Sequence, residues 1–157
     1  MMISRLFLVI ILILCSCDSN PIGNNNINIY FNLVIEETGE STLIIFKDTI
    51  TSLETGDEIG VFDASGIADN QGNVDEILVG FGTWDGNQLD IVAIMAQDLS
   101  SFGGPILPGA INSNNVVIKI WKSGTQTLEE NISYEIDTGS GTFNGLFTAY
   151  SELTIQE

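Results

Sequence analysis

Short runs of β-branched and aromatic residues, separated by turn residues at regular intervals, most limit how this chain can fold. Such runs are typical of strands, and the Gly, Asp, Asn and Ser residues between them are typical of turns. The 157 residues include 16 Gly and 3 Pro, which suits many strands joined by tight turns. The predicted strands are residues 27–35, 41–47, 58–63, 77–84, 88–96, 116–122, 132–137 and 146–155. The pattern predicts an all-β fold, a single antiparallel β-sandwich of the immunoglobulin-like or jelly-roll-like kind.

Three local features refine this prediction. Asp85-Gly86 between two apolar runs predicts a tight hairpin, because the dipeptide supplies the positive φ angles of a short turn. Only residues 96–102 are expected to form a short helix, ahead of a Gly-Gly-Pro break. The strand at 116–122 alternates, and either face can be the core side, with Val117, Lys119 and Trp121 on one face and Ile118, Ile120 and Lys122 on the other.

The N-terminus has the layout of an export signal, with Arg5 followed by an unbroken apolar run over residues 6–14. This run is too short for a transmembrane helix, which needs about 20 predominantly apolar residues. Leu14-Cys15-Ser16-Cys17 resembles the lipobox of bacterial lipoproteins, whose last cysteine is lipidated. The resemblance implies removal of residues 1–16 and acylation of Cys17. The alternative is an ordinary secretory signal cleaved near Ser16 or Ser19.

The expected mature protein is a lipidated cysteine with a polar tether over residues 17–26, followed by one domain over residues 27–157. Acylation would attach it to the outer membrane or to the periplasmic face of the inner membrane. Both cysteines of the chain lie in the predicted signal region, so the domain has no thiol for a disulfide.

The chain is strongly acidic, with 21 Asp and Glu against 4 Lys and Arg and a net charge of −17. Such a surface repels nucleic acid, because no counterion release would offset the repulsion between like charges. The remaining partners are the membrane, through the lipid on Cys17, and an envelope protein or a glycan.

Four segments between residues 54 and 145 have familiar sequences. They are Glu54-Thr55-Gly56-Asp57-Glu58-Ile59-Gly60-Val61-Phe62-Asp63, Val79-Gly80-Phe81-Gly82-Thr83-Trp84, Ile120-Trp121-Lys122-Ser123-Gly124 and Gly139-Ser140-Gly141-Thr142-Phe143-Asn144-Gly145. Together they resemble a β-sandwich module of large exported proteins in Bacteroidota and related marine bacteria. The resemblance covers about residues 50 to 150, and implies a sandwich fold and a location outside the cytoplasm. It implies no activity.

One Gly-punctuated loop carries closely spaced oxygen-bearing side chains of the kind that Ca²⁺ prefers. The predicted metal ligands are Asp63, Asp69, Gln71, Asn73, Asp75 and Glu76. The loop is not an EF-hand, because Val74 replaces the expected glycine and no helices flank it. The alternative is a solvated loop whose Asp and Asn side chains form turns.

The tryptophans suggest a second kind of site, a platform on which a sugar ring stacks. Trp84, next to the predicted hairpin, is expected to be the more exposed, and Trp121 is the other candidate. The chain has no His, which removes His-based catalytic triads and His-ligated zinc sites. We therefore expect a non-catalytic, lipid-anchored binding module with calcium as its only candidate cofactor. A carbohydrate-binding module is the first alternative, and a hydrolase that uses a pair of carboxylates is the second.

Overall fold

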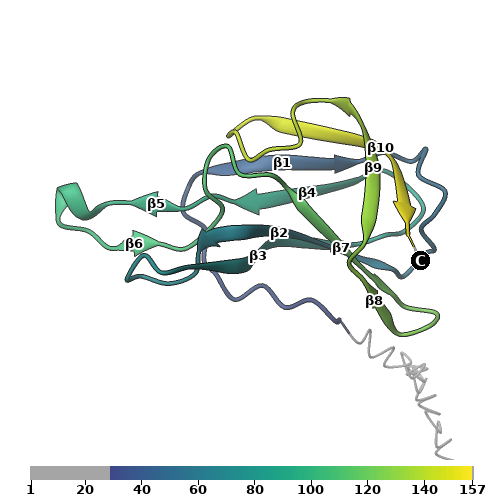
Figure 1. Ribbon diagram of the computed structural model, residues 1–157, viewed down its shortest axis with the longest axis horizontal. Coiled ribbons are helices and arrows are strands. Elements are labelled where there is room, and N and C mark those ends of the chain that lie inside the picture. The colour runs from purple at the N-terminus through teal and green to yellow at the C-terminus, as the bar shows by residue number, and fades with distance from the viewer. Residues whose placement is uncertain (1–28, 157) are drawn as a thin grey trace, which may run out of the picture.

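Alternation along the strands places one face of each of two sheets against a common core. The computed structural model describes residues 29–156, and these residues form two four-stranded sheets packed face to face (Figure 1). The all-β sandwich predicted from the sequence is confirmed. The predicted signal peptide and tether, residues 1–26, lie outside the described residues. Among residues 29–156, no helix is long and apolar enough to cross a membrane.

The first sheet, sheet A, has the order β4-β1-β10-β9, and the second, sheet B, has the order β3-β2-β7-β8. In sheet A the strands are β4 (Leu89–Ile94), β1 (Ser41–Phe46), β10 (Phe147–Ile155) and β9 (Ile132–Thr138). In sheet B they are β3 (Val74–Thr83), β2 (Glu58–Ile67), β7 (Val117–Lys122) and β8 (Thr127–Glu129). Both sheets are mainly antiparallel, and β1 and β10 are the one pair of these strands that runs parallel.

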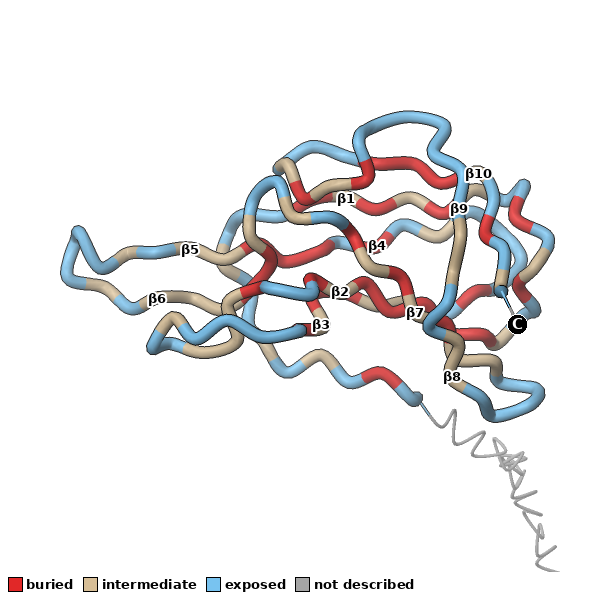
Figure 2. The backbone as a smooth tube through the Cα atoms, viewed as in Figure 1, coloured by how far each residue is buried: buried red, intermediate tan, exposed pale blue. Residues whose placement is uncertain are grey.

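The core lies between the inner faces of the two sheets, where the buried backbone is concentrated (Figure 2). From β7 it takes Ile118 and Ile120, so the face with Val117, Lys119 and Trp121 points outward. The largest fully buried apolar side chains of the core are Tyr150, Phe46, Phe143, Ile44, Ile59, Ile120, Leu153, Val61 and Val79. The structure therefore assigns the face with Ile118 and Ile120 to the core, which the sequence pattern left open.

One side of the sandwich is closed where β3 of sheet B meets β4 of sheet A. A Cβ atom at Gly80 would lie 2.8 Å from the carbonyl oxygen of Val92, which is closer than real Cβ atoms approach. The absence of a side chain at Gly80 therefore allows the backbones of β3 and β4 to approach each other closely. The opposite side carries the outer strands β9 and β8.

A two-stranded arm projects from the end of the sandwich that lies on the left in Figure 1. It consists of β5 (Gln97–Asp98), a three-residue 3-10 helix η1 (Ser100–Phe102) and β6 (Ile106–Leu107). The short helix predicted for residues 96–102 is thus wrong in its first half, where β5 forms, and is only a single 3-10 turn in its second half. The short strand pair and Gly103, with a φ of 77°, turn the chain back.

The hairpin predicted around Asp85-Gly86 is also corrected. Gly86 has a φ of 94°, as a tight turn requires, and the Asp85 side chain accepts a hydrogen bond from the Asn87 amide. However, β3 and β4 belong to different sheets, so this turn joins the two layers and not two paired strands. Turn chemistry is local, whereas the sheet in which each strand pairs depends on the rest of the fold.

Residues 29–35, predicted as part of a strand at 27–35, form no strand. This covering segment (residues 29–35) lies against the outer face of sheet B, with Phe31 packed on Phe62 at a ring-centroid distance of 5.7 Å. Its amides at Tyr30 and Phe31 donate to the Glu58 carboxylate and not to a neighbouring strand. A side chain therefore replaces the strand partner that the sequence pattern led us to expect.

Tyr150 leads to a pH-dependent prediction, because its hydroxyl is buried and has no hydrogen-bond partner among residues 29–156. Burial, with a smaller contribution from Tyr134, raises the pKa of Tyr150 well above its usual value of about 10. Above about pH 10 the unfolded chain releases this proton while the folded chain keeps it, so the free energy of unfolding falls by about 1.4 kcal/mol per pH unit. Tyr150→Phe is expected to flatten this alkaline loss, as measured by urea unfolding at pH 8 to 11. An unchanged slope would contradict the assignment.

Candidate functional site

Asp63, the first predicted metal ligand, lies inside β2 and only 1% of its surface is exposed. Its carboxylate accepts hydrogen bonds from the backbone amides of Ser65 at 2.9 Å and Ile111 at 2.8 Å. The Asn114 side-chain amide also donates to it, at 2.9 Å and 3.0 Å. These donors hold β2 against the segment that leads into β7, so the carboxylate already has a structural role.

The loop itself is shorter than predicted, because β2 continues to Ile67 and β3 begins at Val74. Asp69 organises this loop by accepting hydrogen bonds from the backbone amides of Gln71 and Asn73 and from the Asn73 side chain. The side-chain bond from Asn73 is the main cause that lowers the pKa of Asp69. The loop thus matches the alternative of a turn built by Asp and Asn side chains.

The last two predicted ligands lie on β3. Asp75 accepts a hydrogen bond from the amide of Glu76 at 2.8 Å. Glu76 forms an ion pair with Lys119 of β7 at 2.7 Å, and Lys119 also pairs with Glu130 at 2.6 Å.

The structure does not bring the six predicted metal ligands together. Within the described part of the chain, no group of three or more Asp and Glu side chains is arranged to hold a metal ion. Sequence spacing put these residues close along the chain, but Asp63 turns into the protein while Asp69 lies on the exposed loop.

The expected exposure of Trp84 is wrong, since only 3% of this residue is exposed. Its amide donates to the carbonyl of Asp57 and its carbonyl accepts from Gly56, so the residue is fixed beside the start of β2. Trp121 does lie on the outer face of sheet B, but Tyr30 of the covering segment stacks on it, with ring centroids 4.0 Å apart and an interplanar angle of 4°. Tyr30 thus occupies the stacking position that a sugar ring would need.

Two buried carboxylates that the sequence reasoning missed stand side by side at the start of β2. Glu58 binds the two amides of the covering segment, from Tyr30 at 2.8 Å and Phe31 at 3.0 Å. Asp57 accepts hydrogen bonds from the Glu54 amide and the Ser123 amide and forms an ion pair with Lys122. No sequence signal could reveal these partners, because most of them lie 27 or more residues away along the chain.

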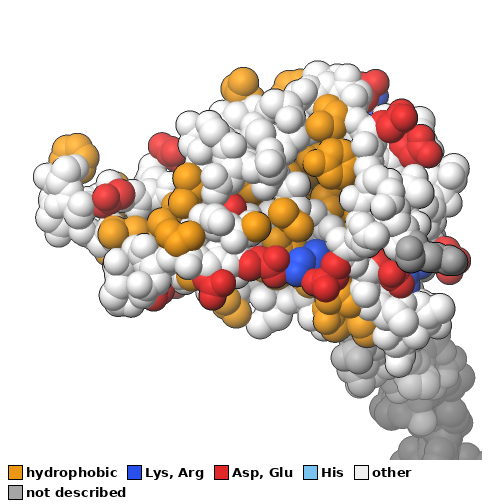
Figure 3. Space-filling model, viewed as in Figure 1, with side chains coloured by type: hydrophobic (Ala, Val, Ile, Leu, Met, Phe, Trp, Pro, Cys, Tyr) orange, Lys and Arg blue, Asp and Glu red, His pale blue; other side chains and the backbone are white. Residues whose placement is uncertain are grey.

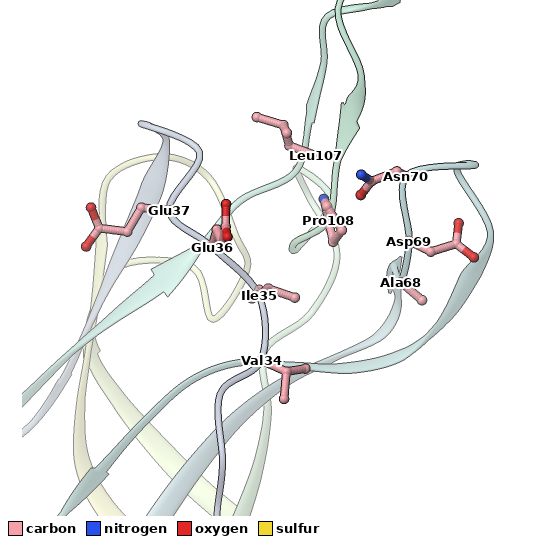
Figure 4. A pocket seen from close by; sticks show the side chains of 9 residues that line it. All are labelled: Val34, Ile35, Glu36, Glu37, Ala68, Asp69, Asn70, Leu107 and Pro108. Atoms are coloured by element: carbon pink, nitrogen blue, oxygen red, sulfur yellow. The ribbon is translucent and has the colours of Figure 1, made fainter.

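A hollow of about 420 Å³ lies where the covering segment, the 68–70 loop and the base of the arm meet (Figure 4). Its lining residues are Val34, Ile35, Glu36, Glu37, Ala68, Asp69, Asn70, Leu107 and Pro108. The carboxylates of Asp69 and Glu37 point away from its centre (Figure 4). The wall of the hollow is therefore mixed, with apolar side chains such as Val34, Leu107 and Pro108 beside polar groups.

Comparisons of the chain with protein-family models, with curated proteins and with solved structures find no match.

Proposed function

We propose that this protein is a lipid-anchored, non-catalytic binding module of the bacterial cell envelope. The anchor is the diacylated Cys17, and the sandwich is the part that meets a partner. The sequence Leu14-Cys15-Ser16-Cys17 carries the first half of the proposal. The resemblance to exported sandwich modules supports a location outside the cytoplasm.

The observation that carries the binding role is the exposure of large apolar side chains on projecting parts of an otherwise acidic molecule (Figure 3). Phe102 at the tip of the arm is 88% exposed, Val34 at the end of the covering segment is 81% exposed and Leu146 is 71% exposed. Covering exposed apolar side chains of this size with a partner is favourable, because it removes their apolar surface from water. The described chain begins below β7 and β8, away from the arm (Figure 1).

The other two functions receive less support. A sugar platform would need an open aromatic face, but Trp84 is buried and Trp121 is covered by Tyr30. A hydrolase would need two carboxylates facing substrate. The buried carboxylates Asp57, Glu58 and Asp63 instead accept hydrogen bonds from the protein's own backbone.

Metabolic labelling tests the anchor. Cells that produce the chain are grown with an alkyne-tagged fatty acid, and the protein is isolated and coupled to a fluorophore. The wild-type chain is expected to carry the label, and Cys17→Ser is expected to abolish it, because the thiol is the site of attachment. Cys15→Ser is the matched control and is expected to keep the label. Equal labelling of Cys17→Ser and the wild type, or no labelling of the wild type, would overturn the proposal.

A further inference from the structure

β9 is an outer strand of sheet A, and its outer edge pairs with no other strand of the described residues. It has seven residues and pairs with β10 alone. β8, the other outer strand on this side, has only three residues, and the outer strands β3 and β4 approach each other at Gly80 on the opposite side. A free edge exposes unpaired N–H and C=O groups that can accept another strand.

The side chains of β9 make this edge suitable for an incoming strand. Tyr134 and Ile136 lie on one face and are 39% and 37% exposed, and the Tyr134 ring packs edge-on against buried Tyr150. Between β7 and β9 the surface shows a group of hydrophobic side chains (Figure 3). A strand added beside β9 would cover these apolar groups with its own alternating apolar side chains.

The opposite face of β9 determines which partner fits. It carries the exposed acids Glu135 and Asp137. Asp137 forms an ion pair with Lys47 at 2.6 Å, whereas Glu135 has no basic partner among the described residues. Glu129 and Glu130 lie just before the strand, and Glu130 pairs with Lys119. If the β9 strands of two copies paired, these acids would be brought close to the same acids of the other copy, and like charges across a strand pair are destabilising. A partner strand with Lys or Arg on that face would instead find opposite charge. The edge therefore disfavours self-association and favours a basic strand.

We infer that β9 accepts by strand addition an extended segment of a partner protein in which Lys or Arg alternates with apolar residues. This inference rests on the proposed binding role and names its surface and partner. Main-chain hydrogen bonds supply the affinity of such a pairing, and alternate side chains supply its specificity. The basic side chains lie on the face of Glu135, and the apolar ones lie beside Tyr134 and Ile136.

The test uses the purified full chain in detergent and a seven-residue synthetic peptide in which lysine alternates with valine, matching the length of β9. Binding is measured at about 0.15 M salt, where charges more than about 8 Å apart are largely screened. Backbone amide hydrogen exchange then locates the peptide. A second peptide of the same sequence and charge carries N-methyl groups on alternate amides, so it cannot complete the main-chain ladder. We expect the first peptide to slow amide exchange in β9 and the second to leave it unchanged.

Two variants with the same change in net charge provide the matched comparison. Glu135→Lys, at the proposed contact, is expected to weaken binding at least about tenfold, and Asp90→Lys, on β4, is expected to change it less than about twofold. Equal binding of the N-methylated peptide, equal effects of the two variants, protection of another edge, or no binding would overturn the inference. The anchor proposal is judged separately by labelling at Cys17, so a failure here with labelling intact removes only the β9 surface.

Discussion

Replacing Asp57 with alanine is expected to lower the free energy of unfolding by about 3–5 kcal/mol, the usual loss when one partner of a buried ion pair is removed. The Asp57 carboxylate is fully buried and binds the ammonium group of Lys122 as well as the amides of Glu54 and Ser123. Truncation leaves all three donors without their acceptor where water does not easily reach. Urea unfolding followed by circular dichroism measures the loss.

Two controls separate the ion pair from other effects of this substitution. Asp85→Ala removes an exposed carboxylate that accepts only a local bond from Asn87, and is expected to change stability by less than about 1 kcal/mol. The double variant Asp57→Ala with Lys122→Met removes the orphaned ammonium group, so it should recover part of the loss. If the double variant is no more stable than Asp57→Ala alone, the ion pair is not the cause.

Asp63→Ala is the second large effect, with an expected loss of about 3–4 kcal/mol, because each orphaned buried donor costs roughly 1–3 kcal/mol. The donors are the Ser65 and Ile111 amides and the Asn114 side chain. Since these protein donors already use the carboxylate, the loss should be the same with added Ca²⁺ and with chelator. Thermal and urea unfolding in both conditions measure it.

Asp75→Ala is the matched control for Asp63, because Asp75 belongs to the same predicted metal set but is exposed and accepts a bond only from its neighbour Glu76. Its effect should stay within about 0.5 kcal/mol. A loss at Asp63 that appears only with Ca²⁺ present would show that the carboxylate acts as a metal ligand, contrary to the expectation from its hydrogen bonds.

The predicted and observed elements agree best where the pattern is local. The strand predicted at 132–137 differs from β9 by one residue, and the β-rich runs around residues 41–47 and 116–122 became β1 and β7. Alternation and turn residues act within a few positions of the chain, so the sequence displays them directly. Residues 29–35 belong to a segment that was also predicted as a strand, but they form none, and the amides of Tyr30 and Phe31 bind the Glu58 carboxylate instead.

The candidate site was less predictable, because its chemistry depends on distant contacts. Proximity along the chain grouped Asp63 with Asp69, but one is buried in a strand and the other organises an exposed turn. Trp84 follows a strand and precedes a turn, which is typical of an exposed residue, yet it packs into the core.

By itself, the sequence determined the strand-rich class of the fold, the positions of the main turns and the acidic character of the surface, since these depend on local backbone preferences and on composition. Only the tertiary structure decided which face of β7 meets the core, that β1 and β10 run parallel, and that Tyr30 covers Trp121. It also decided that Asp57, Glu58 and Asp63 are structural carboxylates. The physical reason is that burial and pairing bring together residues far apart in the chain, and no local pattern encodes which ones meet.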